Sequence, residues 1–205
     1  MPTRFYLDIS NTNASGPGAS QSTTLPTGTH NTNSPSGLYD DGLLNPNTGF
    51  TGSGAVSFTS LAQTARQSGR YAIMASSELA AQTISSGTWT FNCYSGESAN
   101  QANAYFALCV YIWRPSTSSV VGFIYNSAAE LGTEWTIAGG FVNFTFSGSS
   151  VTAQANDVLV LEVWYTSAQA KAASYTLNAY FDDQEYIDAP QNILFFRSKR
   201  AIVIS

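Results

Sequence analysis

Charged side chains are scarce in this chain of 205 residues, because Asp, Glu, Lys and Arg together make up 10% of it. An ordinary soluble domain carries about 25%. The 8 basic residues are outnumbered by 13 acidic ones, which gives a net charge of −5. Duplex nucleic acid needs clustered lysine and arginine to neutralise its phosphates, so we expect no nucleic-acid binding. A surface of Ser, Thr, Asn and Gly instead suits a protein that is packed in an assembly, or one that works outside the cell.

Histidine and cysteine are also rare, which removes most nucleophilic and zinc chemistry. The single histidine, His30, would have to serve any Ser-His-Asp or Cys-His site, and it lies in a tract of small polar residues. Two cysteines, Cys93 and Cys109, are too few for a disulfide framework. We expect both to be reduced and buried, with a bond between them as the alternative. The sequence therefore predicts that the protein is not an enzyme.

Long apolar runs and helical periodicity are missing as well. No run approaches the roughly 18 residues of a membrane helix, and the first residues lack the apolar stretch of a signal peptide. We therefore expect no membrane association, and synthesis in a cytoplasm. Residues 76–83 indicate a helix of one or two turns, and residues 63–67 are similar.

Period-two alternation of apolar and polar residues is what the chain does contain. Trp89 and Phe91 share one strand face, and Phe144 and Phe146 share another, with Thr145 opposite. Several such strands, bounded by clusters of Gly, Ser and Asn, favour an all-β fold. Short strands separated by turn clusters in this way predict a β-sandwich or a β-barrel.

Residues 104–113 and 158–165 are apolar on both strand faces. Such a strand is either central in its sheet or lies against a neighbouring subunit. The second alternative would place residues 104–113 at the axis of a homotrimer.

Residues 10–37 form an uncharged tract of small polar residues that cannot fold alone. We therefore divide the chain into an N-terminal strand with an extended arm at 1–49 and a sandwich domain at 50–190. Residues 191–205 form a C-terminal tail or a closing strand. A partner chain would hold the arm in place, or the arm would pack on its own domain.

The start of the chain, residues 2–7 followed by the small polar tract, resembles the start of tailed-bacteriophage virion proteins. The strand segments at residues 87–91, 105–113, 121–124 and 156–163 resemble jelly-roll domains of capsid decoration and fibre proteins, and of some carbohydrate-binding modules. The resemblance implies an antiparallel β-sandwich of the jelly-roll type. The resemblance implies a structural protein of the virion, most simply a capsid decoration or cement protein. Its partners would be the major capsid protein or other virion proteins, and it would form a homotrimer.

Four aromatic residues lie outside the apparent core stripe: Trp113, Tyr125, Trp135 and Tyr180. We expect them to belong to an interface or to the core, with stacking on sugar rings as the alternative. They support the alternative function of a carbohydrate- or receptor-binding module on a tail or head fibre.

Asp182, Asp183, Glu185 and Asp188 form an acidic cluster after a predicted strand. Their spacing lacks the alternate acids and the turn glycine of an EF-hand loop, so we expect a solvated loop and no cofactor. A structural calcium ion near Asp182 and Asp183 is one alternative. A polysaccharide hydrolase that uses two of the four carboxylates is another.

Overall fold

The computed structural model describes residues 2–12, 15–17, 19–24, 39–46, 54–59, 67–167, 173–181 and 184–195. Within these residues the chain forms β-strands and two short 3-10 helices, and no α-helix. The strands are β1 (Arg4–Thr12), β2 (Tyr39–Asn45), β3 (Gly54–Thr59), β4 (Gln67–Ser76), β5 (Gln82–Ile84), β6 (Gly87–Glu97), β7 (Tyr105–Arg114), β8 (Ser119–Leu131), β9 (Gly140–Gly148), β10 (Val151–Ala153), β11 (Val158–Ser167), β12 (Thr176–Phe181) and β13 (Tyr186–Asp188). The helices are η1 (Asn100–Ala102) and η2 (Pro115–Thr117).

One large sheet contains most of these strands, in the order β3-β12-β6-β13-β1-β2-β4-β11-β7-β8, with β9 paired to β6. β5 and β10 form a separate two-stranded sheet. Among the described strands, every pair is antiparallel except β2 with β4. The predicted all-β antiparallel sandwich is confirmed, while its jelly-roll connectivity stays a prediction.

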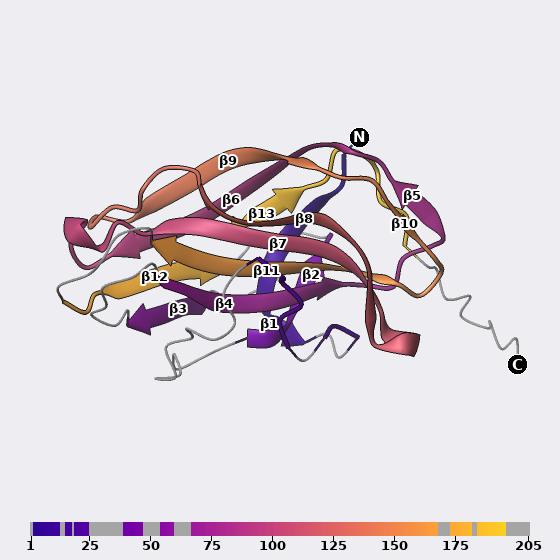
Figure 1. Ribbon diagram of the computed structural model, residues 1–205, viewed down its shortest axis with the longest axis horizontal. Helices are drawn as coiled ribbons and strands as arrows, with labels where there is room; N and C mark the ends of the chain where they lie inside the picture. The colour runs from indigo at the N-terminus through magenta and orange to yellow at the C-terminus, as the bar shows by residue number, and fades with distance from the viewer. Residues whose placement is uncertain are drawn as a thin grey trace, which may run out of the picture.

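The large sheet folds over on itself, so that two layers enclose one hydrophobic core (Figure 1). β6, β9, β12 and β13 belong to one layer and β4, β11, β7 and β8 to the other, with β1 and β2 between them. Phe91 of β6 meets Phe106 of β7 across the core, with 5.3 Å between ring centroids. Phe144 of β9 packs on Phe91 at 5.2 Å. The alternation seen in the sequence therefore points these rings inward.

β7 and β11 lie next to each other inside their layer, and almost all of their residues are buried on both faces. The chain itself covers both faces, since one face joins the main core and the other belongs to two smaller apolar clusters. Residues 104 and 106–113 are therefore buried within a single subunit, and Tyr105 is half-buried. The predicted placement of this strand at a three-fold axis is wrong, because no apolar face of it is left for a neighbour.

The N-terminal strand is an integral part of the sandwich. Phe5 and Leu7 are fully buried in the core, and β1 pairs with β13 on one side and β2 on the other. The backbone N–H of Ala189 donates to the carbonyl oxygen of Thr3 at 2.9 Å. Residues before 50 thus supply two strands to the same sheet as residues 50–190.

The helical turns predicted for residues 76–83 are wrong, because the backbone there bonds to distant segments. Of the similar segment at 63–67, only Gln67 is described, and it begins β4. The N–H of Leu79 donates to the carbonyl oxygen of Asp157 at 2.8 Å, and the N–H of Ala80 donates to that of Leu194 at 2.9 Å. Phe195 forms a β-bridge with Leu79. Residues 191–195 thus close this end of the sandwich, and residues 196–205 lie outside the described residues.

The described part of the chain contains no helix with the length and apolarity that a bilayer crossing requires.

Gly132 follows β8 in the left-handed backbone region, at φ +77°, and a β-carbon there would lie 2.5 Å from Val142 Cγ1. Gly132→Ala is therefore expected to strain the backbone and overpack the core, which together lower the free energy of unfolding by about 2–3 kcal/mol. Urea denaturation measures the change. Gly140→Ala is the matched control, because a β-carbon there meets nothing within 4 Å. Equal losses in the two variants would contradict the prediction.

Candidate functional site

The outer face of the β4-β11-β7-β8 layer carries a buried carboxylate, Glu162 of β11, which is 0% exposed. Its Oε1 accepts hydrogen bonds from the backbone N–H of Gln21 at 2.7 Å and from the Tyr111 hydroxyl at 2.9 Å. Its Oε2 accepts from the Ser20 hydroxyl at 2.6 Å and from Trp164 Nε1 at 3.0 Å. Glu162 therefore ties two arm residues to the middle of this layer.

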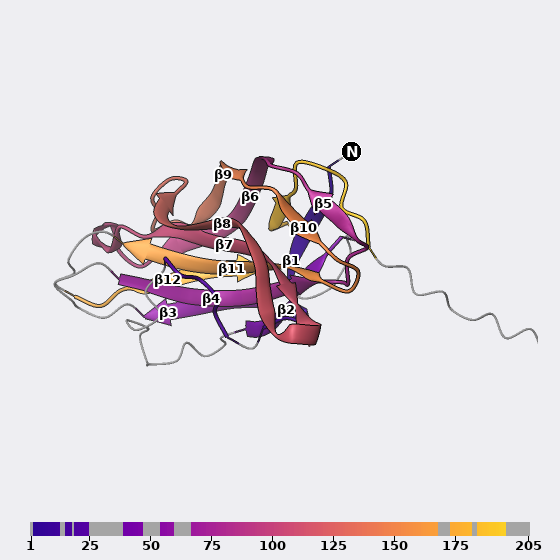
Figure 2. The same cartoon turned by 45° about the vertical axis from the view of Figure 1, so that its right-hand side comes forward.

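Asn126 of β8 holds the next arm residues. Its Oδ1 accepts hydrogen bonds from the hydroxyls of Ser22 at 2.9 Å and Thr24 at 2.8 Å, and its Nδ2 donates to the Thr23 hydroxyl at 2.7 Å. Residues 19–24 consequently cross the outer face from β11 to β8, in front of the sheet in Figure 2. We call this surface, residues 19–24 with the strands beneath them, the arm face.

The groups beneath the arm titrate far from their ordinary range. Burial raises the pKa of the Cys109 thiol, and the nearby Glu162 carboxylate raises it further. Burial likewise raises the pKa of Tyr111, with Glu162 adding to the shift and Arg70 opposing it. Both groups therefore stay neutral at physiological pH, and the Tyr111 hydroxyl keeps the proton that it donates to Glu162.

A groove of about 450 Å³ lies at one end of the arm face. Trp113, Pro115 and Ser118 form one wall, and arm residues between 15 and 21 form the other. Trp113 is 8% exposed, so the candidate interface residue predicted from the sequence lies at the edge of the groove with little of its ring accessible.

The outer face of the opposite layer carries a second candidate surface. Three aromatic side chains meet edge to face there: Tyr94 of β6 lies 5.3 Å from Phe141 of β9 and 5.2 Å from Tyr180 of β12, centroid to centroid. Beside them is a pocket of about 260 Å³. It is lined by Tyr94, Gly96, Glu97, Ser98, Ile137, Ala138, Gly139, Asn178 and Tyr180. We call these residues and Phe141 the aromatic pocket.

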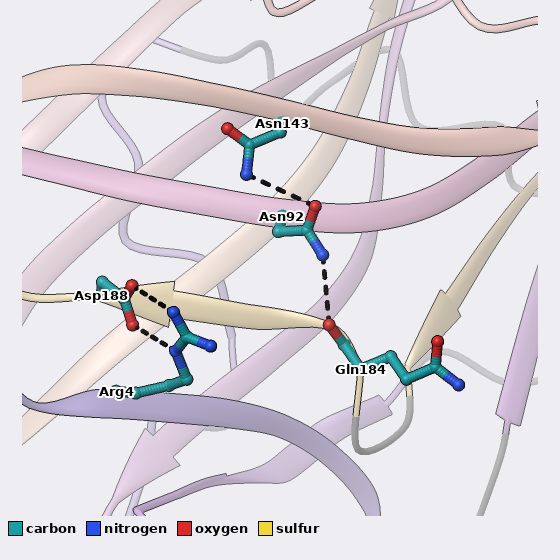
Figure 3. Close-up of polar contacts among 5 residues, drawn as sticks. All are labelled: Arg4, Asn92, Asn143, Gln184 and Asp188. Carbon is teal, nitrogen blue, oxygen red and sulfur yellow. Dashed lines mark hydrogen bonds and ion pairs between the residues drawn. The ribbon is translucent and has the colours of Figure 1, made fainter.

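A polar ladder continues from the aromatic pocket along the same outer face (Figure 3). Asn143 Nδ2 donates to Asn92 Oδ1 at 3.5 Å, and Asn92 Nδ2 donates to the carbonyl oxygen of Gln184 at 3.1 Å. Farther along, Arg4 forms a two-pronged ion pair with Asp188, at 2.7 and 2.8 Å. This hydrogen-bonded ion pair raises the pKa of Arg4, so the two charges neutralise each other on this face.

The four aromatic residues predicted from the sequence have different surroundings. Trp135 is 2% exposed and packs 4.7 Å from Phe106, and the half-buried Tyr125 packs 4.5 Å from Phe146, centroid to centroid. Trp135 therefore belongs to the core, which was one of the alternatives for it. Strand periodicity could not decide between them, because Trp135 lies in a connecting loop. Of the four, Tyr180 lines the aromatic pocket and Trp113 the groove.

Tyr94 and Phe141 are functional candidates that the sequence reasoning missed. The signal was present, because Phe91 and Cys93 alternate inward with Tyr94 outward, and Val142 alternates with Phe141. What the pattern could not supply is the register, in which Tyr94 stands opposite Phe141.

The two cysteines are free and buried, as expected. Cys93 lies in β6, in the main core, whereas Cys109 lies in β7, in a separate cluster. The alternative of a bond between them is wrong, because the two strands belong to different layers and do not pair.

The acidic cluster is described only in part, since Asp182, Asp183 and also His30 lie outside the described residues. Glu185 is buried at 1% exposure and its Oε1 accepts from the backbone N–H of Tyr94 at 3.4 Å. Asp188 pairs with Arg4. Among the described residues no three His, Cys, Asp or Glu side chains gather as a metal site would require, and calcium near Asp182 and Asp183 stays a prediction.

The chain matches no known protein family and no curated protein. One similar solved structure is a CocE/NonD family hydrolase from Staphylococcus aureus, with a TM-score of 0.49 and 10% sequence identity. The match covers 95% of this chain and 36% of the hydrolase, so the chain spans about a third of that protein's length. A likeness this distant carries no argument about function.

Proposed function

We propose that the chain is a non-enzymatic structural protein of a bacteriophage virion, a capsid decoration protein that binds the head shell through its arm face. The observation that carries the proposal is the docked arm. Residues 19–24 have no apolar core of their own, yet Glu162 and Asn126 hold them by hydrogen bonds from strands more than 100 residues away. An uncharged, low-complexity segment is thereby part of a defined outer surface.

The physical properties of the arm face suit a neutral protein partner. Its hydroxyl and amide groups can bond to a partner without the desolvation of ions, which costs several kcal/mol for each charge that is buried. Glu162 and Asn126 already hold residues 19–24 in the free subunit. Binding a partner therefore costs little additional conformational entropy in this part of the arm. Repetition of such contacts over a symmetric shell would add avidity.

In this proposal the partner is the major capsid protein or another virion protein, and the protein is located in the virion. A homotrimer remains the proposed oligomeric state, with contacts outside β7. Sedimentation equilibrium tests the trimer, because it measures the molar mass in solution, which for a trimer is three times that of the chain. A monomer at micromolar concentration would overturn the trimer.

The binding test is co-sedimentation with head shells that lack this protein. Deleting everything before residue 38 would not isolate the arm, because the deletion also removes β1 and the buried Phe5 and Leu7. Asn126→Ala is the sharper variant, since it removes three hydrogen bonds to the arm without a buried apolar contact. We expect saturable binding by the wild type and at least tenfold weaker binding by Asn126→Ala.

The matched control is Asn143→Ala, which changes the same residue type on the outer face of the opposite layer. It should bind shells as the wild type does. Absence of saturable binding by the wild type would overturn the proposed function. Equal binding by all three proteins would move the contact away from the arm face.

A further inference from the structure

We propose that the aromatic pocket is a binding site for a neutral saccharide, which one or two pyranose rings of a glycan would occupy. The site lies on the opposite outer face from the arm face, so it is independent of the proposed contact with the head shell. A decoration protein with both surfaces would attach to its shell on one side and present a sugar site on the other.

The walls of the pocket are prearranged. Gly139 is in the left-handed region, at φ +70°, and a β-carbon there would lie 2.7 Å from the Tyr94 hydroxyl oxygen. The loop backbone therefore packs directly on the Tyr94 ring. Phe141 and Tyr180 each contact the Tyr94 ring edge to face. Little side-chain freedom remains to be lost when a ligand binds.

The lining contains both kinds of group that bind a sugar ring, namely aromatic rings and hydrogen-bonding groups. Tyr94 and Tyr180 offer aromatic rings with hydroxyl tips, suited to the C–H face of a pyranose and to its hydroxyls. Ser98 and Asn178 add polar groups at the wall. Two of the three most exposed large apolar side chains among the described residues, Ile137 at 58% and Phe141 at 49%, stand at the same site. Exposed apolar groups beside convergent polar groups mark a binding site.

The volume of the aromatic pocket and the charge of its lining limit the class of saccharide that it can bind. A volume of about 260 Å³ is below the roughly 300–1,000 Å³ of pockets for drug-sized ligands, which suits one or two sugar rings. Among the described residues that line it, Glu97 carries the only charge. A negative wall without a cation disfavours acidic sugars such as uronic or sialic acids. The polar ladder with Asn92 and Asn143 offers amides along which a longer neutral glycan could continue.

The test is a titration of the isolated full-length protein with methyl glycosides of glucose, galactose, mannose and N-acetylglucosamine. Amide resonances are followed by NMR, and glucuronic acid serves as the charged comparison. For a ligand of this size we expect a dissociation constant on the order of millimolar. At least one neutral glycoside should shift the resonances of Gly96, Gly139 and Asn178, and glucuronic acid should not.

Three variants separate stacking from a general loss of structure. Tyr180→Ala is expected to weaken binding at least tenfold, whereas Tyr180→Phe, which keeps the ring, should stay within about threefold of the wild type. Tyr6→Ala, a half-buried tyrosine on β1 of the same outer face, is the matched control and should bind normally. Thermal unfolding confirms that each variant is folded.

Two results would overturn the saccharide site. One is the absence of shifts in the pocket with all four neutral glycosides, and the other is equal binding by Tyr180→Ala and the wild type. Neither result bears on the shell-binding proposal, because co-sedimentation tests binding through the arm face and uses different variants.

Discussion

Replacing Glu162 with glutamine is expected to lower the free energy of unfolding by about 3–5 kcal/mol, as for other buried charged networks that lose a member. The reason lies in the donors around the carboxylate. Each oxygen accepts one bond from a group that can only donate, the Gln21 N–H at Oε1 and Trp164 Nε1 at Oε2. Whichever oxygen becomes an amide nitrogen, two donors will face each other in a buried site. The arm should therefore detach.

Urea denaturation measures the loss of stability, and limited proteolysis measures release of the arm. Glu78→Gln is the matched control, because Glu78 is exposed and the substitution removes the same charge. Its effect should stay within about 0.5 kcal/mol. Ser20→Ala, which removes the bond of 2.6 Å to Glu162, should lose about 1.5–2 kcal/mol. Equal stability of Glu162→Gln and Glu78→Gln would contradict this account of the arm face.

Alkaline pH is expected to destabilise the protein even more, on the order of 7 kcal/mol between pH 8.5 and 11. Burial raises the pKa of Tyr71, Tyr111 and Tyr165 above the ordinary value of about 10, and that of Cys109 above about 8.5. Above those ordinary values the unfolded chain releases protons that the folded chain retains. Stability is thus fully present below pH 8.5 and is lost as the pH rises, by up to about 1.4 kcal/mol per pH unit for each group.

The measurement is a series of urea denaturation curves from pH 7 to 11, with the tyrosinate absorbance recorded in the folded state. Because small domains are stable by about 5–15 kcal/mol, a loss of about 7 kcal/mol should remove about half of the stability or more by pH 11, and the urea midpoint should fall accordingly. Tyr165→Phe removes one titrating group and should reduce the alkaline slope by about 1.4 kcal/mol per pH unit above pH 10. A flat stability profile up to pH 11 would show that these hydroxyls titrate normally.

The strands that the sequence predicted well are those whose two faces differ. In β9 every second residue from Val142 onward is apolar, so alternation alone indicates which face is buried. The central position of β7 and β11 also follows from their apolar composition. The helix predicted for residues 76–83 does not form, although Glu78 and Leu79 favour a helix locally. The carbonyl oxygens of Asp157 and Leu194 accept the backbone hydrogen bonds that decide the conformation there.

The arm face and the aromatic pocket could not be predicted from the sequence. Glu162 stands in the middle of an apolar strand, and nothing in its neighbours indicates that Ser20, some 140 positions earlier, covers it. Tyr94, Phe141 and Tyr180 come from three strands, and only the pairing register brings the rings of Phe141 and Tyr180 within 5.3 Å of the Tyr94 ring, centroid to centroid.

The sequence by itself determined the all-β class, the inward faces of the strands and the poverty in charge, because these depend on composition and on a period of two along the chain. The tertiary structure alone decided where the arm lies, which aromatic residues are core and which form a pocket, and that β7 is buried within one subunit. Those features depend on contacts between residues far apart in the chain, whose distances are set by strand order and register and leave no local pattern.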